Sequence, residues 1–203
     1  MSIPAPTVYV VDDDVSFLTA VARLLRAGGY AVKLYSSADA FVKDPPPEPV
    51  GCVIVDLHMP GMDGMELQEV LARSSSPLPV IFLTGHGDIA TSVHAMRKGA
   101  EDFLTKPVNR EKLFEAVQRA LVRNALQRAA GARDRELRAL YETLTPRERE
   151  VMTHVVAGRL NKQIAADIDA AERTVKAHRA SIMAKLRVQS VADLVRLSQS
   201  LGL

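Results

Sequence analysis

Residues 52–64 read Cys-Val-Ile-Val-Asp-Leu-His-Met-Pro-Gly-Met-Asp-Gly, a short apolar run that ends in an acidic side chain and a loop. The run is too short for a buried helix, so it predicts a buried β-strand over residues 52–55 that ends at Asp56. A helical pattern follows over residues 65–72. This strand–loop–helix unit indicates an α/β arrangement in its part of the chain.

The same alternation of apolar run and helical pattern recurs on both sides of this unit. It predicts further strands at residues 8–11, 31–35, 80–83 and 102–104, and helices at residues 17–25, 38–42, 88–98 and from 110 onward. Five strand–helix units with short connections imply a parallel sheet with helices on both faces. The expected fold is therefore a doubly wound (βα)5 domain of the flavodoxin-like type.

The last 60 residues contain only helical patterns. Residues 145–148 supply an N-cap, a proline at the first helical position and a capping-box acid for a helix that ends near Gly158. We expect Asn161 to cap a second helix, a tight turn to lead into a basic third helix over residues 172–186, and Ser190 to start a fourth. A helix, a tight turn and a basic helix are typical of an all-α helix-turn-helix domain that binds DNA.

These patterns predict a domain at residues 1–124, a partly helical linker at residues 125–143 and a second domain at residues 144–203; a short coiled coil is an alternative for the linker. Charge separates the two ends of the chain in the same way. The first 125 residues hold 12 basic and 15 acidic side chains, and the remainder hold 14 and 9. This asymmetry indicates an anionic partner for the second half only.

Composition excludes several classes of protein. With 47% hydrophobic and 25% charged residues the chain is ordinary globular. Its one cysteine, Cys52, lies in an apolar run, which excludes a disulfide framework and favours a small buried side chain over a reactive thiol. No charge-free apolar stretch approaches the ~18 residues that span a bilayer, and residues 1–7 do not resemble a signal peptide. We therefore expect a cytoplasmic protein without a membrane partner.

Polar side chains follow four of the predicted strands: Asp12 and Asp13 the first, Asp56 the third, Thr84 the fourth and Lys106 the fifth. Each alone could be a solvated loop residue, but the carboxyl ends of parallel strands meet at one edge of a sheet. Three neighbouring carboxylates raise one another's pKa, and a hard divalent cation relieves that repulsion. Carboxylate ligands favour Mg²⁺ or Mn²⁺. These side chains together suit a site in which an aspartate attacks a phosphoryl group, while the metal and the lysine neutralise the negative charge that develops.

The segments Asp12-Asp13, Asp56-Leu-His-Met-Pro-Gly-Met-Asp-Gly64, Thr84-Gly85 and Lys106-Pro107 resemble the receiver domain of bacterial response regulators. The resemblance implies that Asp56 accepts a phosphoryl group from a phosphohistidine of a sensor histidine kinase. It implies that the metal is held by Asp12, Asp13, Asp56 and the main-chain carbonyl of His58. It also implies that Thr84 and Lys106 sense the phosphoryl group and that Phe103 is a switch aromatic. Asp14 is commonly acidic in this family, but we do not expect it to be a ligand.

Residues 144–201 resemble the DNA-binding domain of LuxR/FixJ-type regulators, through Leu-Thr-Pro-Arg-Glu-Arg-Glu150, Asn161-Lys-Gln-Ile-Ala165 and Arg173-Thr-Val-Lys176. The resemblance implies a four-helix bundle whose third helix enters the major groove. The expected DNA contacts are Lys162, Arg173, Thr174, Lys176, His178 and Arg179.

The second resemblance has departures. Asp169 stands at a turn position where relatives usually have glycine, and Ala171 replaces a serine-type N-cap. Ala177 and Ala180 could contact only thymine methyl groups, so direct readout of sequence rests heavily on Lys176.

The whole pattern predicts a phosphorylation-controlled transcription regulator rather than an enzyme. Phosphorylation would either form a homodimer through the face around residues 88–104 or release a masked DNA-binding domain, and the sequence does not choose between them. RNA polymerase is a further expected partner. Two alternatives are a phosphate-independent dimerisation module and a small metal-dependent phosphohydrolase.

Residues 85–90 also fit the loose G-x-G-x-x-A pattern of a dinucleotide-binding loop. They follow the fourth strand, however, and no acid stands about 20 residues further on. We expect a tight turn there, with His86 as a loop residue.

Overall fold

The computed structural model describes residues 5–47, 49–74, 76–85 and 89–203. The chain divides into two compact units, an N-terminal unit of residues 1–128 and a C-terminal unit of residues 129–203. Each unit has its own hydrophobic core. None of the described helices is long and apolar enough to cross a membrane.

The described part of the N-terminal unit forms a five-stranded parallel sheet in the order β2-β1-β3-β4-β5. Strands and helices alternate along the chain, which confirms the doubly wound (βα)5 fold. The predicted helix start at Asp88 and the loop residue His86 lie outside the described residues. The elements are β1 (Thr7–Val11), α1 (Val15–Ala27), β2 (Ala31–Tyr35), α2 (Ala38–Lys43), β3 (Gly51–Val55), α3 (Gly64–Arg73), β4 (Val80–Thr84), α4 (Ile89–Arg97), β5 (Asp102–Thr105) and α5 (Arg110–Glu142).

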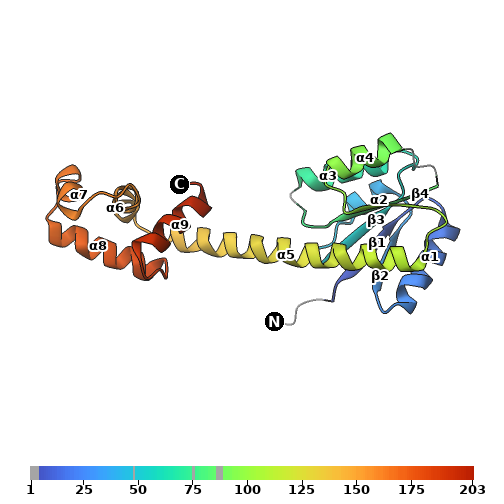
Figure 1. Cartoon of the computed structure of the whole chain (residues 1–203), viewed down its shortest axis with the longest axis horizontal. Coiled ribbons are helices and arrows are strands. Elements are labelled where there is room, and N and C mark those ends of the chain that lie inside the picture. The colour runs from blue at the N-terminus through green and yellow to red at the C-terminus, as the bar shows by residue number, and fades with distance from the viewer. Residues whose placement is uncertain (1–4, 48, 75, 86–88) are drawn as a thin grey trace. The chain divides into compact units, whose positions relative to one another are not determined.

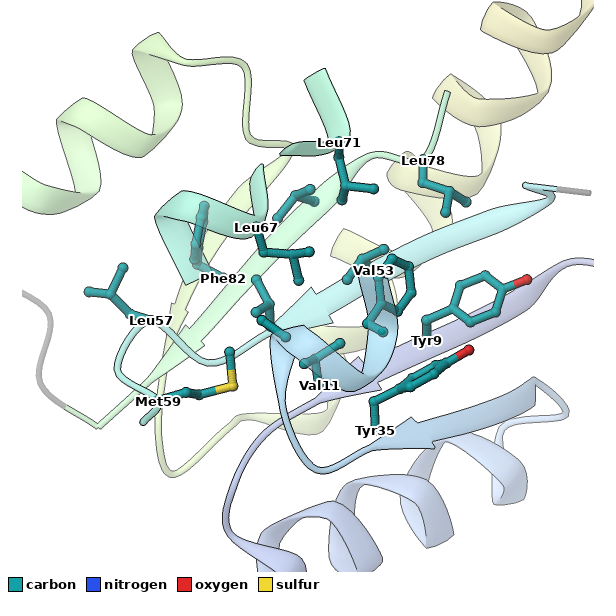
Figure 2. Packing of buried hydrophobic residues seen from close by; sticks show 14 of the residues in the cluster. Tyr9, Val11, Tyr35, Val53, Leu57, Met59, Leu67, Leu71, Leu78 and Phe82 are labelled. Carbon is teal, nitrogen blue, oxygen red and sulfur yellow. The ribbon is translucent and has the colours of Figure 1, made fainter. Parts of the chain in front are cut away.

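Alternate side chains of each strand enter the two cores of this unit, because successive residues of a strand point to opposite faces. Val8 and Val10 of β1 pack with α1 and α5, whereas Tyr9 and Val11 pack with α2, α3 and α4. Figure 1 shows the sheet between these helices. Figure 2 shows at close range the core that contains Tyr9 and Val11. Cys52 is fully buried, and burial raises the pKa of its thiol to about 12, which confirms the predicted structural role.

The order of strands reverses beside β1, because β2 lies on one side of it and β3 on the other. The last residues of β1 and β3, Val11 and Val55, are paired in register. The next residue along each strand is Asp12 and Asp56, so the fold places these two carboxylates side by side at the switch point.

Helix α5 is longer than the sequence predicted. Residues 125–142 form uninterrupted helix through Gly131, where a partly helical linker was expected. The first part of α5 is buried against the sheet, and Asn124 donates to the carbonyl of Pro77 at 2.7 Å and accepts from Gly51 N–H at 3.0 Å. Its last turns pack against the core of the C-terminal unit through Leu137, Leu140 and Tyr141. The domain boundaries proposed from the sequence stay a prediction.

In the C-terminal unit, α5 is followed by α6 (Pro146–Val156), α7 (Asn161–Asp167), α8 (Glu172–Lys185) and α9 (Val191–Leu201). Thr145 caps α6 in a capping box with Glu148, as predicted. The expectation for Asn161 was wrong: Leu160 is the N-cap of α7, and Asn161 is the first helical residue. The Asn161 side chain instead accepts a hydrogen bond from Arg179 of α8.

Glu148 links α6 to α8 inside the C-terminal unit. It is 4% exposed, its Oε2 lies 2.7 Å from Lys185 Nζ, and its Oε1 accepts from Ser181 Oγ at 2.6 Å. The hydrogen bond from Lys185, followed by that from Ser181, lowers the pKa of Glu148 to about 2. A lowered pKa contributes stability above the ordinary glutamate pKa of about 4.3, and that stability is lost as pH falls through the folded value.

We therefore expect Glu148→Gln to destabilise the C-terminal unit by about 1–3 kcal/mol at neutral pH. The variant should also lose less stability than the parent between pH ~4.3 and ~2. Hydrogen exchange of α6 peptides, measured by mass spectrometry across this range, tests both expectations. Glu150→Gln, at an exposed position of the same helix, is the matched control. Equal acid sensitivity in parent and Glu148→Gln would contradict the prediction.

Candidate functional site

Three carboxylates meet at the carboxyl edge of the sheet. Asp12, Asp13 and Asp56 each offer an oxygen, and these oxygens all lie within 4.8 Å of one another. Asp12 is buried, Asp56 is partly buried and Asp13 is exposed. The cluster therefore has a buried floor and an opening to solvent, and its all-oxygen donor set suits a hard divalent cation.

Lys106 is inserted into this cluster from the loop after β5. Its Nζ lies 2.6 Å from Asp12 Oδ2 and 3.0 Å from Asp56 Oδ2, and it stands 4.0 Å from the centre of the Phe17 ring. The other oxygen of Asp56, Oδ1, is buried and has no hydrogen-bond partner among the described residues. Buried polar atoms nearly always have a hydrogen-bond partner or a bound ion, and a cation between the carboxylates would be such a partner for Oδ1.

Burial and charge act in opposite directions on the ionisable groups here. Burial raises the pKa of Asp12, although Lys106 and the Asp14 N–H hold it down in part. Burial lowers the pKa of Lys106, but its hydrogen bonds to Asp12 and Asp56 outweigh burial and the net shift is upward. Lys106 is therefore charged at neutral pH, and one ammonium faces three carboxylates.

Asp14, the third acidic residue of the run, has a different role. Its side chain caps α1 by accepting from the N–H groups of Ser16 at 2.9 Å and Phe17 at 3.1 Å. An N-cap oxygen satisfies helix donors that would otherwise lack partners. This use of its carboxylate agrees with its omission from the expected metal ligands.

The remaining expected site residues lie on β4, on β5 and on the loop after β3. Thr84 is buried at the end of β4, and its carbonyl accepts from the Lys106 N–H at 2.8 Å. Phe103 of β5 is partly buried, with its ring centre 6.0 Å from that of Phe82. The His58 side chain is exposed on the loop after β3. The role of its carbonyl stays a prediction.

Gly64 has a structural role that sequence reasoning did not assign. A Cβ atom at this position would lie 2.3 Å from the Asp56 carbonyl oxygen, so α3 begins in direct contact with the backbone of Asp56. Asp63 caps this helix in a capping box with Glu66. The Asp63–Glu66 spacing was visible in the sequence; the close approach to Asp56 was not.

The predicted DNA-binding residues fall into two groups. Lys162, Arg173 and Lys176 are exposed and form no ion pair within the part of the chain that the structure describes. Thr174, His178 and Arg179 are only partly exposed, and Arg179 Nη1 donates to Asn161 Oδ1 at 2.8 Å. Val175 and Ile182 bury the opposite stripe of α8, as predicted.

The turn between α7 and α8 carries both departures noted in the sequence. Asp169 adopts the left-handed conformation with φ 48°, which glycine adopts at lower cost. Ala171 is the N-cap of α8 and makes no side-chain cap hydrogen bond. Arg147 of α6 donates to the Ile168 carbonyl at the end of α7 and thereby fixes the entry to the turn.

The fold and the two sites define a class: a regulator with a receiver-type domain followed by a helix-turn-helix domain. Comparison with known families gives the particular group. Residues 8–118 match the response regulator receiver domain, and residues 142–198 match the bacterial regulatory proteins of the luxR family. The chain belongs to the LuxR/FixJ family of response regulators.

Similar proteins span nearly the whole chain. Nodulation protein W of Bradyrhizobium diazoefficiens is 42% identical over 196 residues, covering 97% of this chain and 86% of that protein. The transcriptional regulatory protein FixJ of Rhizobium meliloti is 40% identical over 196 residues, covering 97% and 96%. The solved structure of the response regulator StyR has a TM-score of 0.84 at 43% identity, covering 97% of this chain and 99% of that one.

The chain is therefore a transcriptional response regulator with a receiver domain and a LuxR-type DNA-binding domain. Its receiver domain implies a sensor histidine kinase as partner, and its LuxR-type domain implies binding to DNA.

Proposed function

We propose that Asp56 is the residue that receives the phosphoryl group. The observation that carries the proposal is its position between Asp12, Asp13 and the Lys106 ammonium, with Oδ1 buried and without a partner among the described residues. A carboxylate oxygen of Asp56 attacks phosphorus, the N–P bond of the kinase phosphohistidine breaks, and the imidazole takes the bonding electrons. The product is an acyl phosphate on Asp56.

Asp12, Asp13, Asp56 and the His58 carbonyl would hold Mg²⁺, or Mn²⁺ in its place. The unpartnered oxygen and the all-oxygen donor set support this assignment. When bound, the cation neutralises negative charge that develops on the phosphoryl oxygens. Lys106 supplies a second positive charge from the protein itself.

Phosphorylation replaces one carboxylate charge by a group of about −1.5 to −2. Lys106 then moves from the carboxylates to the phosphoryl oxygens, Thr84 donates its hydroxyl to them, and Phe103 turns inward. We propose that this rearrangement changes the face formed by α4 and β5. Val93 and Met96 of α4 are 44% and 45% exposed, which supports a role for this face in contact with a second copy.

A homodimer on this face would present two α8 helices to half-sites about one turn of DNA apart. Release of a masked DNA-binding domain is the alternative route to the same output. In either case Lys162, Arg173, Thr174, Lys176, His178 and Arg179 form the proposed DNA-binding surface. RNA polymerase is the proposed partner at the promoter. Both the kinase phosphohistidine and the chromosome are reached in the cytoplasm, which is the proposed location.

Acetyl phosphate with Mg²⁺ tests the proposal directly. We expect one phosphoryl adduct by intact mass, a larger assembly by size-exclusion chromatography and tighter binding to duplex DNA by fluorescence anisotropy. Asp56→Asn should abolish all three responses. Asp39→Asn, the same change at an exposed position of α2, should leave them intact. An adduct that survives Asp56→Asn would overturn the assignment. Dimers that form equally without a phosphodonor would favour the phosphate-independent module.

A further inference from the structure

Arg179 makes a contact that a residue committed to DNA would not need. Its Nη1 donates to Asn161 Oδ1 at 2.8 Å, and both side chains are partly buried. Asn161 is the first residue of α7, whereas Arg179 lies in the middle of α8. The bond therefore ties the start of one helix of the helix-turn-helix to the body of the other.

The start of α7 is otherwise weakly held. The helix has seven residues, and its N-cap Leu160 has no side-chain acceptor and is 69% exposed. The Leu160 N–H is satisfied within the same turn, by Gln163 Oε1 at 2.9 Å. The buried residues Ile164 and Ala165 lie further along. Within the described chain, Arg179 is thus the side chain from α8 that fixes the first residue of α7.

Lys162 follows Asn161 directly and is exposed, with no ion pair among the described residues. A lysine is a point charge on a flexible stem, so the position of its backbone sets the region that its ammonium can reach. A guanidinium, in contrast, is a planar fork, and one donor fixed on Asn161 sets the orientation of the whole group.

We propose that Arg179 is a positioning residue: through Asn161 it fixes the start of α7 and so presents Lys162 to the DNA phosphates. The proposal rests on the proposed DNA-binding role of the C-terminal unit. It differs from the role first expected of Arg179, in which the guanidinium itself contacts DNA. Under that role, Arg179 and Lys162 would each make a phosphate contact of their own, and the losses caused by removing them would add.

The salt dependence of DNA affinity separates the two roles. Log affinity falls with log salt, and each lost phosphate contact lowers the magnitude of this slope by about 0.9. The probe is a fluorescein-labelled duplex of random sequence, titrated with the full chain at several salt concentrations. Asn161→Ala removes no charge, yet we expect it to lower the slope by about 0.9 per protomer. Arg179→Met and Lys162→Met should each lower it by the same amount, and the paired variants should lower it no further.

A parental slope for Asn161→Ala, together with additive losses for Arg179→Met and Lys162→Met, would overturn the positioning role. Arg173→Met is the control for the function on which the proposal rests, and it should lower the slope in every background. Salt-independent binding of the parent would overturn that function and the positioning role with it. Hydrogen exchange at residues 164–168 guards against loss of α7, because alanine at the first helical position suits a helix and protection there should be retained.

Discussion

A chain with methionine in place of Lys106 is expected to bind Mg²⁺ about tenfold more tightly than the parent and to lose the phosphorylation-dependent rise in DNA affinity. The Lys106 ammonium lies 2.6 Å from Asp12 and 3.0 Å from Asp56, so it uses two of the carboxylates that a cation would bind. A cation and an ammonium compete for the same oxygens. Removing the ammonium leaves them more negative and strengthens their attraction for a divalent ion.

The second effect follows from the same geometry. Without the Lys106 ammonium, the phosphoryl group that we propose on Asp56 loses its charged contact with the loop after β5, and only the backbone bond from the residue 106 N–H to the Thr84 carbonyl, at 2.8 Å, still joins this loop to β4. The adduct should therefore still form with acetyl phosphate, but DNA affinity should not respond to it. Adduct formation and output are separated in this variant, whereas Asp56→Asn removes both.

Isothermal titration calorimetry with Mg²⁺ and anisotropy with duplex DNA measure the two effects. Lys98→Met is the matched control, because Lys98 is also paired with a carboxylate, that of Glu69, on α3. Its loss should leave Mg²⁺ affinity unchanged. If Lys106→Met bound Mg²⁺ no better than the parent, competition between ammonium and cation would not describe this site.

The gathering of site residues at one edge of the sheet could be predicted from the sequence, because it depends on where each strand ends. Each strand ends where an apolar run meets a polar residue, and a parallel sheet brings all such ends to one edge. Asp12, Asp56 and Lys106 are therefore expected to lie together, and the structure has them in contact. Within the run Asp12–Asp14 spacing alone could not assign roles, because the N-cap of α1 and the cluster draw on consecutive residues.

The contacts that sequence reasoning missed are between residues far apart in the chain. Asn161 was expected to cap α7 on its local preference, but Arg179, 18 residues further on, uses its side-chain oxygen instead. Glu148 was assigned only its capping role, whereas Lys185 lies 37 residues away and pairs with it. Helical periodicity identifies which face of a helix is buried, but it does not identify which polar side chain on another helix that face will meet.

Gly64→Ala is expected to lower the stability of the N-terminal unit by about 3 kcal/mol and to slow phosphorylation of Asp56. The added Cβ would lie 2.3 Å from the Asp56 carbonyl oxygen and 3.1 Å from the Phe82 ring, and the nearest atom is backbone that cannot rotate away. Either α3 or the Asp56 backbone must shift. The Gly64 N–H also donates to the Leu57 carbonyl at 3.0 Å, and a shift of α3 weakens this bond.

Urea unfolding followed by tyrosine fluorescence measures the stability loss, since three of the four tyrosines belong to the N-terminal unit and the chain has no tryptophan. Gly85→Ala is the control, because a Cβ there would meet none of the described residues within 4 Å, and it should unfold at the parental urea concentration. The rate of adduct formation with acetyl phosphate measures the second effect. Parental stability for Gly64→Ala would mean that α3 can move away from Asp56 at little cost, and the backbone of Asp56 would then not be held by this helix.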